Sequence, residues 1–389
     1  MRKNMNDVIT EITKPGGGTT SSPKKRDSNL ELFRIITMLL IVAHHFVVNS
    51  GLTAPDGPIY ANPMSGRSLF LLLFGAWGKI GINCFVMITG YFMCKSQITA
   101  KKFAKLCGEW LFYRYTIYLI FLISGYEHFS LKTFAMAAIP MYQVATNFTT
   151  CFVLFWLCIP FLNILIQHLN ERQHIRLLVL SCFIYVFFGT VHTVTMNYVS
   201  WFIVLYFIAS YIRLYPKKCF ANTKLWGVLT VCTAFISAIS VVACAWLGTK
   251  LNRNIAFFFV TDSNTFWAVA VGVCSFMFFK NVKLKYNAFI NTVAASTFGV
   301  LCIHANSDTM RQWLWKDTLD NVGHYDSSIM PLYAIGSVVG VFAVCVVIDI
   351  LRIKFVEKPF FKFWDKHWDS FNAKFQNKED KIFKKLNVE

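Results

Sequence analysis

The segment NLELFRIITMLLIVAHHFVVNSG, residues 29–51, combines a long apolar run with Glu31, Arg34, His44 and His45. A membrane-spanning helix needs about 20 predominantly apolar residues, and this segment supplies them. Ionisable side chains inside a membrane are costly, and they usually face the interior of a helix bundle or a watery cavity. The run is also long and has no small-residue cleavage site of the kind that ends a signal peptide. The segment therefore predicts a first membrane helix with a polar site on one face.

The composition extends this interpretation to the whole chain. Of its 389 residues 56% are hydrophobic and 15% are charged, and the mean hydropathy is +0.48. Soluble domains typically contain about 45–50% apolar and about 25% charged residues. We therefore expect an all-α polytopic membrane protein in contact with a lipid bilayer.

Ten segments satisfy the length criterion for a membrane span, within a few residues at each end. Two of them, 176–191 and 199–214, are short; they could tilt, or they could meet within the membrane without each crossing it. The segment 133–145 is too short to span and is expected at the surface. The ten predicted spans are residues 31–48, 72–93, 104–124, 149–167, 176–191, 199–214, 225–247, 265–280, 289–306 and 332–351.

The basic residues predict the orientation of these spans. With the N-terminus inside, 29 of the 38 Lys and Arg residues fall in cytoplasmic segments and six fall outside. Basic residues concentrate on the cytoplasmic side of membrane proteins, so both termini are expected in the cytoplasm. The net charge of +18 thus reflects short basic clusters between apolar spans, and we expect no nucleic-acid partner.

The chain divides into a membrane domain and two tails. Residues 1–28 are rich in Gly, Ser, Thr, Pro and basic residues, which predicts a disordered cytoplasmic tail. Residues 29–352 form the membrane domain. In residues 353–389 the aromatic residues recur on one helical face, which predicts a basic amphipathic helix along the inner leaflet. These are Phe360, Trp364, Trp368, Phe371 and Phe375.

Helical geometry places three polar residues of the first span on one face. Arg34 and His45 are eleven residues apart, which is about three turns, and Glu31 precedes Arg34 by nearly one turn. His44 points roughly 100° away. The alternative is a purely structural role as an interfacial anchor, in which Glu31 and Arg34 pair near the membrane surface and His45 marks the end of the helix.

Several stretches, in chain order, resemble the acyltransferase 3 family of membrane O-acyltransferases. The Arg34–His45 pair is the first, and it is followed by IGINCFVMITGYFM (80–93), WFIVLYFIASYIRLYP (201–216), STFGVLCIHAN (296–306) and EKP (357–359). The ten-span arrangement is also similar to that of the family. The resemblance covers residues 29–360.

The chain departs from the family pattern at two places. Glu31 stands where many members have Asp, and Lys101, Lys102 and Lys105 stand where many have an arginine cluster. Lysine neutralises phosphate as a point charge but lacks the bidentate fork of arginine, so donor binding could differ here.

The resemblance implies transfer of an acyl group from acyl-coenzyme A to a sugar hydroxyl in the bacterial cytoplasmic membrane. Acetyl is the first expectation and succinyl the alternative. The acceptor would be a surface polysaccharide or a lipid-linked sugar. Acyl-coenzyme A would be a co-substrate, and no permanently bound cofactor is expected.

Chemistry assigns candidate roles to the polar residues. A histidine, with an ordinary pKa near 6.5, suits removal of the hydroxyl proton at neutral pH, and we predict that His45 is this base. His304 lies at the same predicted depth and could stabilise an oxyanion, with Asp308 orienting it; alternatively it is a satisfied interface histidine. Arg34 and, less directly, Arg114 are donor-binding candidates, because arginine suits phosphate. Glu31 would support Arg34 or form a structural ion pair with it.

The depth difference between Arg34 and His45, about 16 Å by helix rise, raises a crossing hypothesis. The pantetheine arm of a cytoplasmic donor would reach through the bundle to an acceptor outside. A metal site is not expected, because the nine histidines do not cluster at ligand spacing and the twelve cysteines contain no CxxC pair. The open alternatives to an enzyme are a transporter of polysaccharide or lipid-linked sugar and a membrane scaffold.

Overall fold

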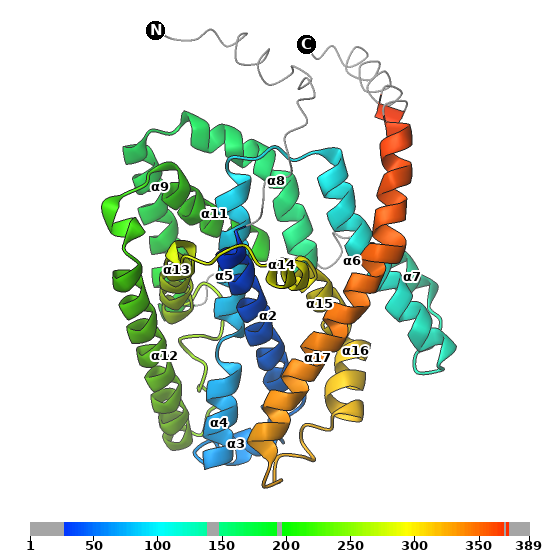
Figure 1. The fold of residues 1–389 in the computed structure, drawn as a ribbon. Helices are drawn as coiled ribbons and strands as arrows, with labels where there is room; N and C mark the ends of the chain where they lie inside the picture. The colour runs from blue at the N-terminus through cyan, green and yellow to red at the C-terminus, as the bar shows by residue number, and fades with distance from the viewer. Residues whose placement is uncertain (1–26, 138–147, 193–196, 369–370, 373–389) are drawn as a thin grey trace.

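The computed structural model describes residues 27–137, 148–192, 197–368 and 371–372, and every regular element within these ranges is a helix. The first described helix, α2 (Ser28–Val48), runs through the middle of the bundle (Figure 1). It contacts helices from nearly every later part of the chain: α4, α5, α13, α14, α15 and α17. The segment with the four ionisable residues is therefore the central helix of the protein.

The first predicted span coincides with α2, and each of the other nine coincides with one helix or with two or three consecutive helices. Their bounds are α4 (Gly66–Gly75) with α5 (Gly78–Met93), α6 (Ala100–Ile123), α8 (Phe148–His168), α9 (Glu171–Cys182) with η2 (Phe183–Phe188) and α10 (Gly189–Val191), α11 (Tyr198–Leu214), α12 (Thr223–Leu251), α13 (Phe266–Asn281), α14 (Ala288–Ala295) with α15 (Thr297–His304), and α17 (Met330–Arg352).

Length and apolarity support membrane crossing for most of these helices. Among the described residues, seven helical runs are long and apolar enough to cross. A further run, Ala288–His304, meets Asp308–Thr318 at a bend of 94°, and α11 and α13 are apolar but shorter. The all-α polytopic membrane fold is confirmed. The number of ten crossings and the cytoplasmic location of both termini stay predictions.

The outer helices carry their apolar side chains on the outside of the bundle. On α12 the exposed fractions of Val231 and Phe235 are 70% and 65%, and on α17 that of Leu332 is 70%. Helices of a soluble protein would bury these faces, whereas a bilayer solvates them. Their exposure is therefore what a lipid-facing surface requires.

The tails agree with the sequence only in part. Helix α17 continues through η5 (Ile353–Glu357) as one helical run from Met330 to Trp368, and Figure 1 shows this run along the right of the bundle. Its aromatic face is formed, since Trp364 and Trp368 stack with ring centroids 4.7 Å apart. Contact of this face with the inner leaflet stays a prediction, and Phe375 and residues 1–26 lie outside the described residues. The first residues of the expected surface segment 133–145 belong to α7 (Leu131–Ala137), and the rest of this segment lies outside the described residues.

Asn83 on α5 joins α5, α11 and α13. Its amide donates to the carbonyls of Ser263 (2.6 Å) and Ala268 (3.0 Å) and accepts from the Trp201 indole (2.9 Å). A buried amide is stable only when such bonds are made. Two of the stretches that resemble the family, 80–93 and 201–216, thus contribute a structural bond to each other.

Candidate active site

His45 and His304 meet in the interior of the bundle. The Nδ1 atom of His45 lies 2.9 Å from Nε2 of His304, although 259 residues separate them in sequence. His304 is fully buried, and its other nitrogen, Nδ1, lies 2.6 Å from the Val300 carbonyl oxygen one turn earlier on α15. The two histidines predicted at one depth are therefore in direct contact.

This chain of contacts determines which nitrogen carries each proton. The Val300 carbonyl can only accept, so Nδ1 of His304 donates to it. In the neutral ring Nε2 of His304 is then an acceptor, and Nδ1 of His45 must donate to it. The remaining nitrogen of neutral His45, Nε2, consequently carries a lone pair. It has no hydrogen-bond partner among the described residues.

His45 lines a cavity of about 210 Å³ at the end of α2. Part of its wall is apolar, with Ile41, Ile82 and Phe148, and part is polar, with His44 and Lys79. Asn49, Thr149, Tyr198 and Arg311 complete the polar part. A cavity with a few convergent polar groups is the usual form of a small-molecule site.

Lys79 and Tyr198 form a polar pair on the cavity wall. Nζ of Lys79 donates to the Tyr198 hydroxyl oxygen at 2.8 Å and lies 3.8 Å from a carboxylate oxygen of Asp262. Because the Tyr198 oxygen accepts from an ammonium group, its own proton remains available to donate. The pair thus gives the cavity a hydrogen-bond donor polarised by a positive charge.

The second histidine, His44, also lines the cavity and is held by the backbone. Its Nδ1 lies 2.7 Å from the Gly75 carbonyl oxygen, so that nitrogen donates. A Cβ atom at Gly78 would lie 2.2 Å from Cβ of His44, which no real contact allows. Glycine at position 78 is therefore required for α5 to approach α2 here.

The contacts of His304 and Asp308 differ from those that the sequence predicted. Both nitrogens of His304 are occupied, and His304 is absent from the lining of the cavity, so its side chain contacts His45 and not the cavity. Asp308 does not reach His304: its carboxylate pairs with Arg311 at 2.8 Å and its side chain is 97% exposed. The orienting group is the backbone carbonyl of Val300.

The candidate donor-binding arginines lie apart from this cavity and from each other. Arg34 lies on α2 towards its start, with Nε 4.0 Å from a Glu31 carboxylate oxygen, and it is also near the Phe85 ring. Arg114 on α6 donates to the Asn306 carbonyl oxygen at 2.9 Å, just beyond the end of α15. Donor binding by Arg34 stays a prediction, whereas Arg114 contacts the backbone two residues beyond His304.

A buried ionic network also involves α6. Arg352 contacts three carboxylates: Glu109 at 3.2 Å, Asp349 at 2.8 Å and Glu357 at 2.9 Å. All four side chains are less than a tenth exposed. Lys105 pairs with Glu357 at 2.6 Å. Since isolated buried charges are very costly, this network ties α6 to the end of α17.

The network also contacts the helix of His304. Asp349 accepts a hydrogen bond from the Tyr113 hydroxyl at 2.8 Å, and a Cβ at Gly299 on α15 would lie 2.3 Å from its Oδ1 atom. The backbone of α15 therefore packs directly on a buried carboxylate. Gly299 and Glu357 both belong to stretches that resemble the family, so these motif residues position α15.

Two residues of the cavity wall, Lys79 and Tyr198, were not predicted as site residues from the sequence. Lys79 lies inside the predicted span 72–93, and a basic residue within a span is a functional candidate. Tyr198, one residue before the predicted span 199–214, gives no such signal, because tyrosine is common at the ends of membrane helices. Among the described residues no group of three His, Cys, Asp or Glu side chains could hold a metal ion.

Comparison with known proteins gives the class of the chain. The family model Acyl_transf_3, described as an acyltransferase domain, matches residues 27–350. The chain therefore belongs to the acyltransferase 3 family, as its motifs indicated, and it is a multi-pass membrane acyltransferase. This favours an enzyme over a transporter or a scaffold. Searches of the curated proteins and of the solved structures give no significant match.

Proposed function

We propose that this protein transfers an acyl group from acyl-coenzyme A to a hydroxyl of a surface polysaccharide or lipid-linked sugar in the bacterial cytoplasmic membrane. Acetyl is the first expected group and succinyl the second. The observation that carries the proposal is the 2.9 Å contact between His45 and His304 at a cavity. It leaves the lone pair of one imidazole nitrogen for a substrate proton.

In this proposal His45 acts as the general base. Its Nε2 accepts the proton of the sugar hydroxyl while the hydroxyl oxygen attacks the thioester carbonyl. The bond from His45 Nδ1 to His304 holds the ring in the tautomer that presents this lone pair, as an acidic or carbonyl partner does in other histidine-dependent sites. When the tetrahedral intermediate collapses, the carbon–sulfur bond breaks and the coenzyme A thiolate takes the proton back from His45.

The Lys79–Tyr198 pair supplies the oxyanion stabilisation. The negative charge of the tetrahedral intermediate develops on the former thioester oxygen, where a fixed donor is most effective. The Tyr198 hydroxyl is such a donor, and the Lys79 ammonium group that bonds to it adds positive charge. This assignment replaces His304 in the role that the sequence proposed for it.

Arg34 is the proposed contact for the donor phosphates, at the opposite half of α2 from His45. Arginine binds phosphate oxygens through parallel N–H groups. The thioester would then cross roughly 16 Å of helix length through the extended pantetheine arm, while the acceptor approaches from the other face. A cysteine at position 45 would be labelled from the outer face in this arrangement; labelling only from the cytoplasm would contradict it.

Transfer of label is the direct test of the function. Membranes containing the protein receive coenzyme A carrying radiolabelled acetyl or succinyl, and the glycan fraction is counted after extraction. Membranes without the protein are the control. We expect ester-linked label in the glycan that mild alkali releases. Absence of label with either donor, while the protein is folded and abundant, would contradict the proposal, and a pure carrier would give that result.

A further inference from the structure

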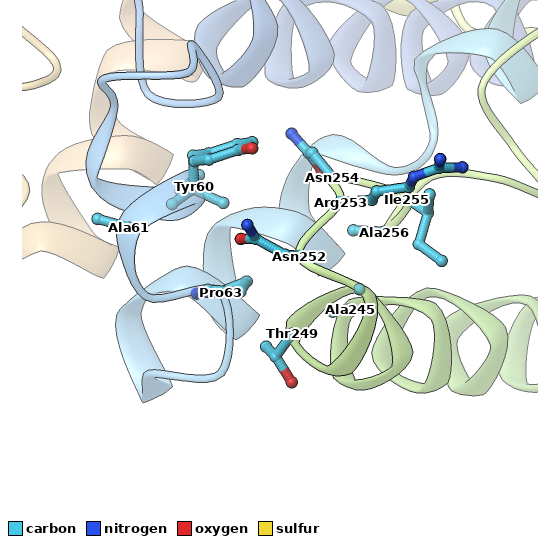
Figure 2. A pocket seen from close by; sticks show the side chains of 12 residues that line it. Tyr60, Ala61, Pro63, Ala245, Thr249, Asn252, Arg253, Asn254, Ile255 and Ala256 are labelled. Atoms are coloured by element: carbon cyan, nitrogen blue, oxygen red, sulfur yellow. The ribbon is translucent and has the colours of Figure 1, made fainter.

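A second cavity opens at the same end of the bundle as the His45 site. It has a volume of about 170 Å³ and lies between α3 (Pro58–Ala61) and the chain that follows α12. Figure 2 shows Tyr60 and Pro63 on the α3 side, and Asn252, Arg253 and Asn254 on the other. In Figure 1, α3 and the end of α12 lie side by side, at the end of the bundle where α2 finishes.

The lining of this cavity has the chemistry of a carbohydrate site. Asparagine amides both donate and accept hydrogen bonds, as sugar hydroxyls do. Tyr60 offers an aromatic surface with a polar tip. The side chains of Tyr60, Asn252, Arg253 and Asn254 make no hydrogen bond to any other described residue, and no carboxylate lines the cavity. These groups are therefore available to a neutral or acidic sugar.

The size of the cavity suits a small ligand. Pockets for drug-sized molecules usually hold about 300–1,000 Å³, and this one is smaller. At about 30 Å³ per water, it corresponds to roughly five or six water molecules. A single glycosyl unit, which has polar hydroxyls and an apolar ring face, suits a lining that is partly polar and partly apolar.

Both walls of this cavity connect to the His45 site. The Ile59 backbone N–H donates to the Leu52 carbonyl at 3.1 Å, which fixes α3 to the turn after α2. On the other wall, the residues after Arg253 lead to Phe257, whose ring lies 6.5 Å from that of His44. Further along the same segment, Asp262 pairs with Lys79 in the His45 cavity.

From these observations we propose that the Tyr60–Asn254 cavity binds a glycosyl unit of the acceptor, next to the unit that receives the acyl group. The inference rests on the proposed function and deepens it, because it separates acceptor recognition from the chemistry at His45. A glycan held at two points would present one hydroxyl to His45 more often than a free sugar does, as positioning effects predict.

Kinetics with a variable acceptor concentration test this inference. The acceptor is the envelope glycan extracted from the producing cells, and the donor is labelled acetyl- or succinyl-coenzyme A at saturation. We expect Tyr60→Ala and Asn254→Ala each to raise the KM for glycan about tenfold, the effect of about 1.4 kcal/mol, and to leave kcat within about twofold. Tyr60→Phe keeps the ring and should lie between Tyr60→Ala and the wild type.

Asn62→Ala is the matched control, since Asn62 is also exposed next to α3 but does not line the cavity. An unchanged glycan KM in both Tyr60→Ala and Asn254→Ala would overturn the inference while the transferase activity stands. Failure of the wild type to transfer any label would instead reject the proposed function. Direct binding of the extracted glycan to His45→Ala protein then decides the inference alone: binding that Tyr60→Ala weakens supports it, and no binding or unaffected binding overturns it.

Discussion

The Nδ1 atom of His45 and the Nε2 atom of His304 lie 2.9 Å apart, and the far nitrogen of His304 is bound to its own helix at the Val300 carbonyl. These two hydrogen bonds determine which ring nitrogens carry protons, and they leave a lone pair on Nε2 of His45. The same arrangement explains why His304 is fully buried while His45 lines the cavity.

The first prediction concerns His304 as a positioning residue. His304→Ala removes the acceptor for the His45 Nδ1–H, so the His45 ring loses its orientation, and kcat should fall by about 10²-fold or more with little change in donor KM. His304→Gln offers a carbonyl acceptor and should recover part of kcat. The measurement is steady-state label transfer. Wild-type kcat in His304→Ala would show that the contact has no role in the reaction.

The second prediction concerns the buried network at Arg352. Arg352→Met leaves three buried carboxylates around an uncharged side chain, and breaking such a buried pair typically costs about 3–5 kcal/mol. We expect a large fall in the thermal unfolding temperature in detergent. Lys101→Ala, which breaks the exposed pair with Asp365, is the control and should change little. Equal unfolding temperatures for the two variants would contradict this account.

The third prediction compares two glycines that face different surroundings. Gly299→Ala would place a Cβ 2.3 Å from Asp349 Oδ1, whereas a Cβ at Gly336 on α17 would meet nothing within 4 Å. Gly299→Ala should therefore lower both thermal stability and kcat, because the clash shifts the helix that carries His304. Gly336→Ala should match the wild type in both. The reverse order would mean that α15 does not pack on Asp349 as described.

The fourth prediction separates the two roles left open for Arg34. If Arg34 binds the donor phosphates, Arg34→Lys keeps the charge but loses the fork, and the KM for acyl-coenzyme A should rise about tenfold with an unchanged unfolding temperature. If Arg34 serves only its ion pair with Glu31, Glu31→Gln should lower stability as much as Arg34→Lys does. Donor titration and thermal unfolding of both variants decide between these roles. A Glu31→Gln variant with the larger rise in donor KM fits neither.

Much of the architecture was predictable from the sequence, because the lipid environment determines it directly. Apolar runs long enough to cross a bilayer must be helices there, and all ten predicted segments are helical. The equal predicted depth of His45 and His304 in the membrane indicated that the two residues could lie close together. Depth alone could not show that the rings touch, nor that Asp308 pairs with Arg311 instead.

The remaining site depended on contacts between distant helices. Arg352 and Glu109 are 243 positions apart in the sequence, and neither belongs to a local pattern that predicts their pairing. Tyr198 joins Lys79 only because α11 packs on α5. Such pairings follow from tertiary packing, which the spacing of residues within one span does not encode.

The central claim is that His45 removes the acceptor proton, and one comparison tests it most directly. Transfer of label from acyl-coenzyme A to glycan is measured for the wild type, His45→Ala and His44→Ala at matched expression. We predict that His45→Ala loses transfer by at least about 10²-fold, while His44→Ala, which changes the neighbouring ring in the same cavity, keeps a larger share of activity. Transfer by His45→Ala at the wild-type rate would contradict the account.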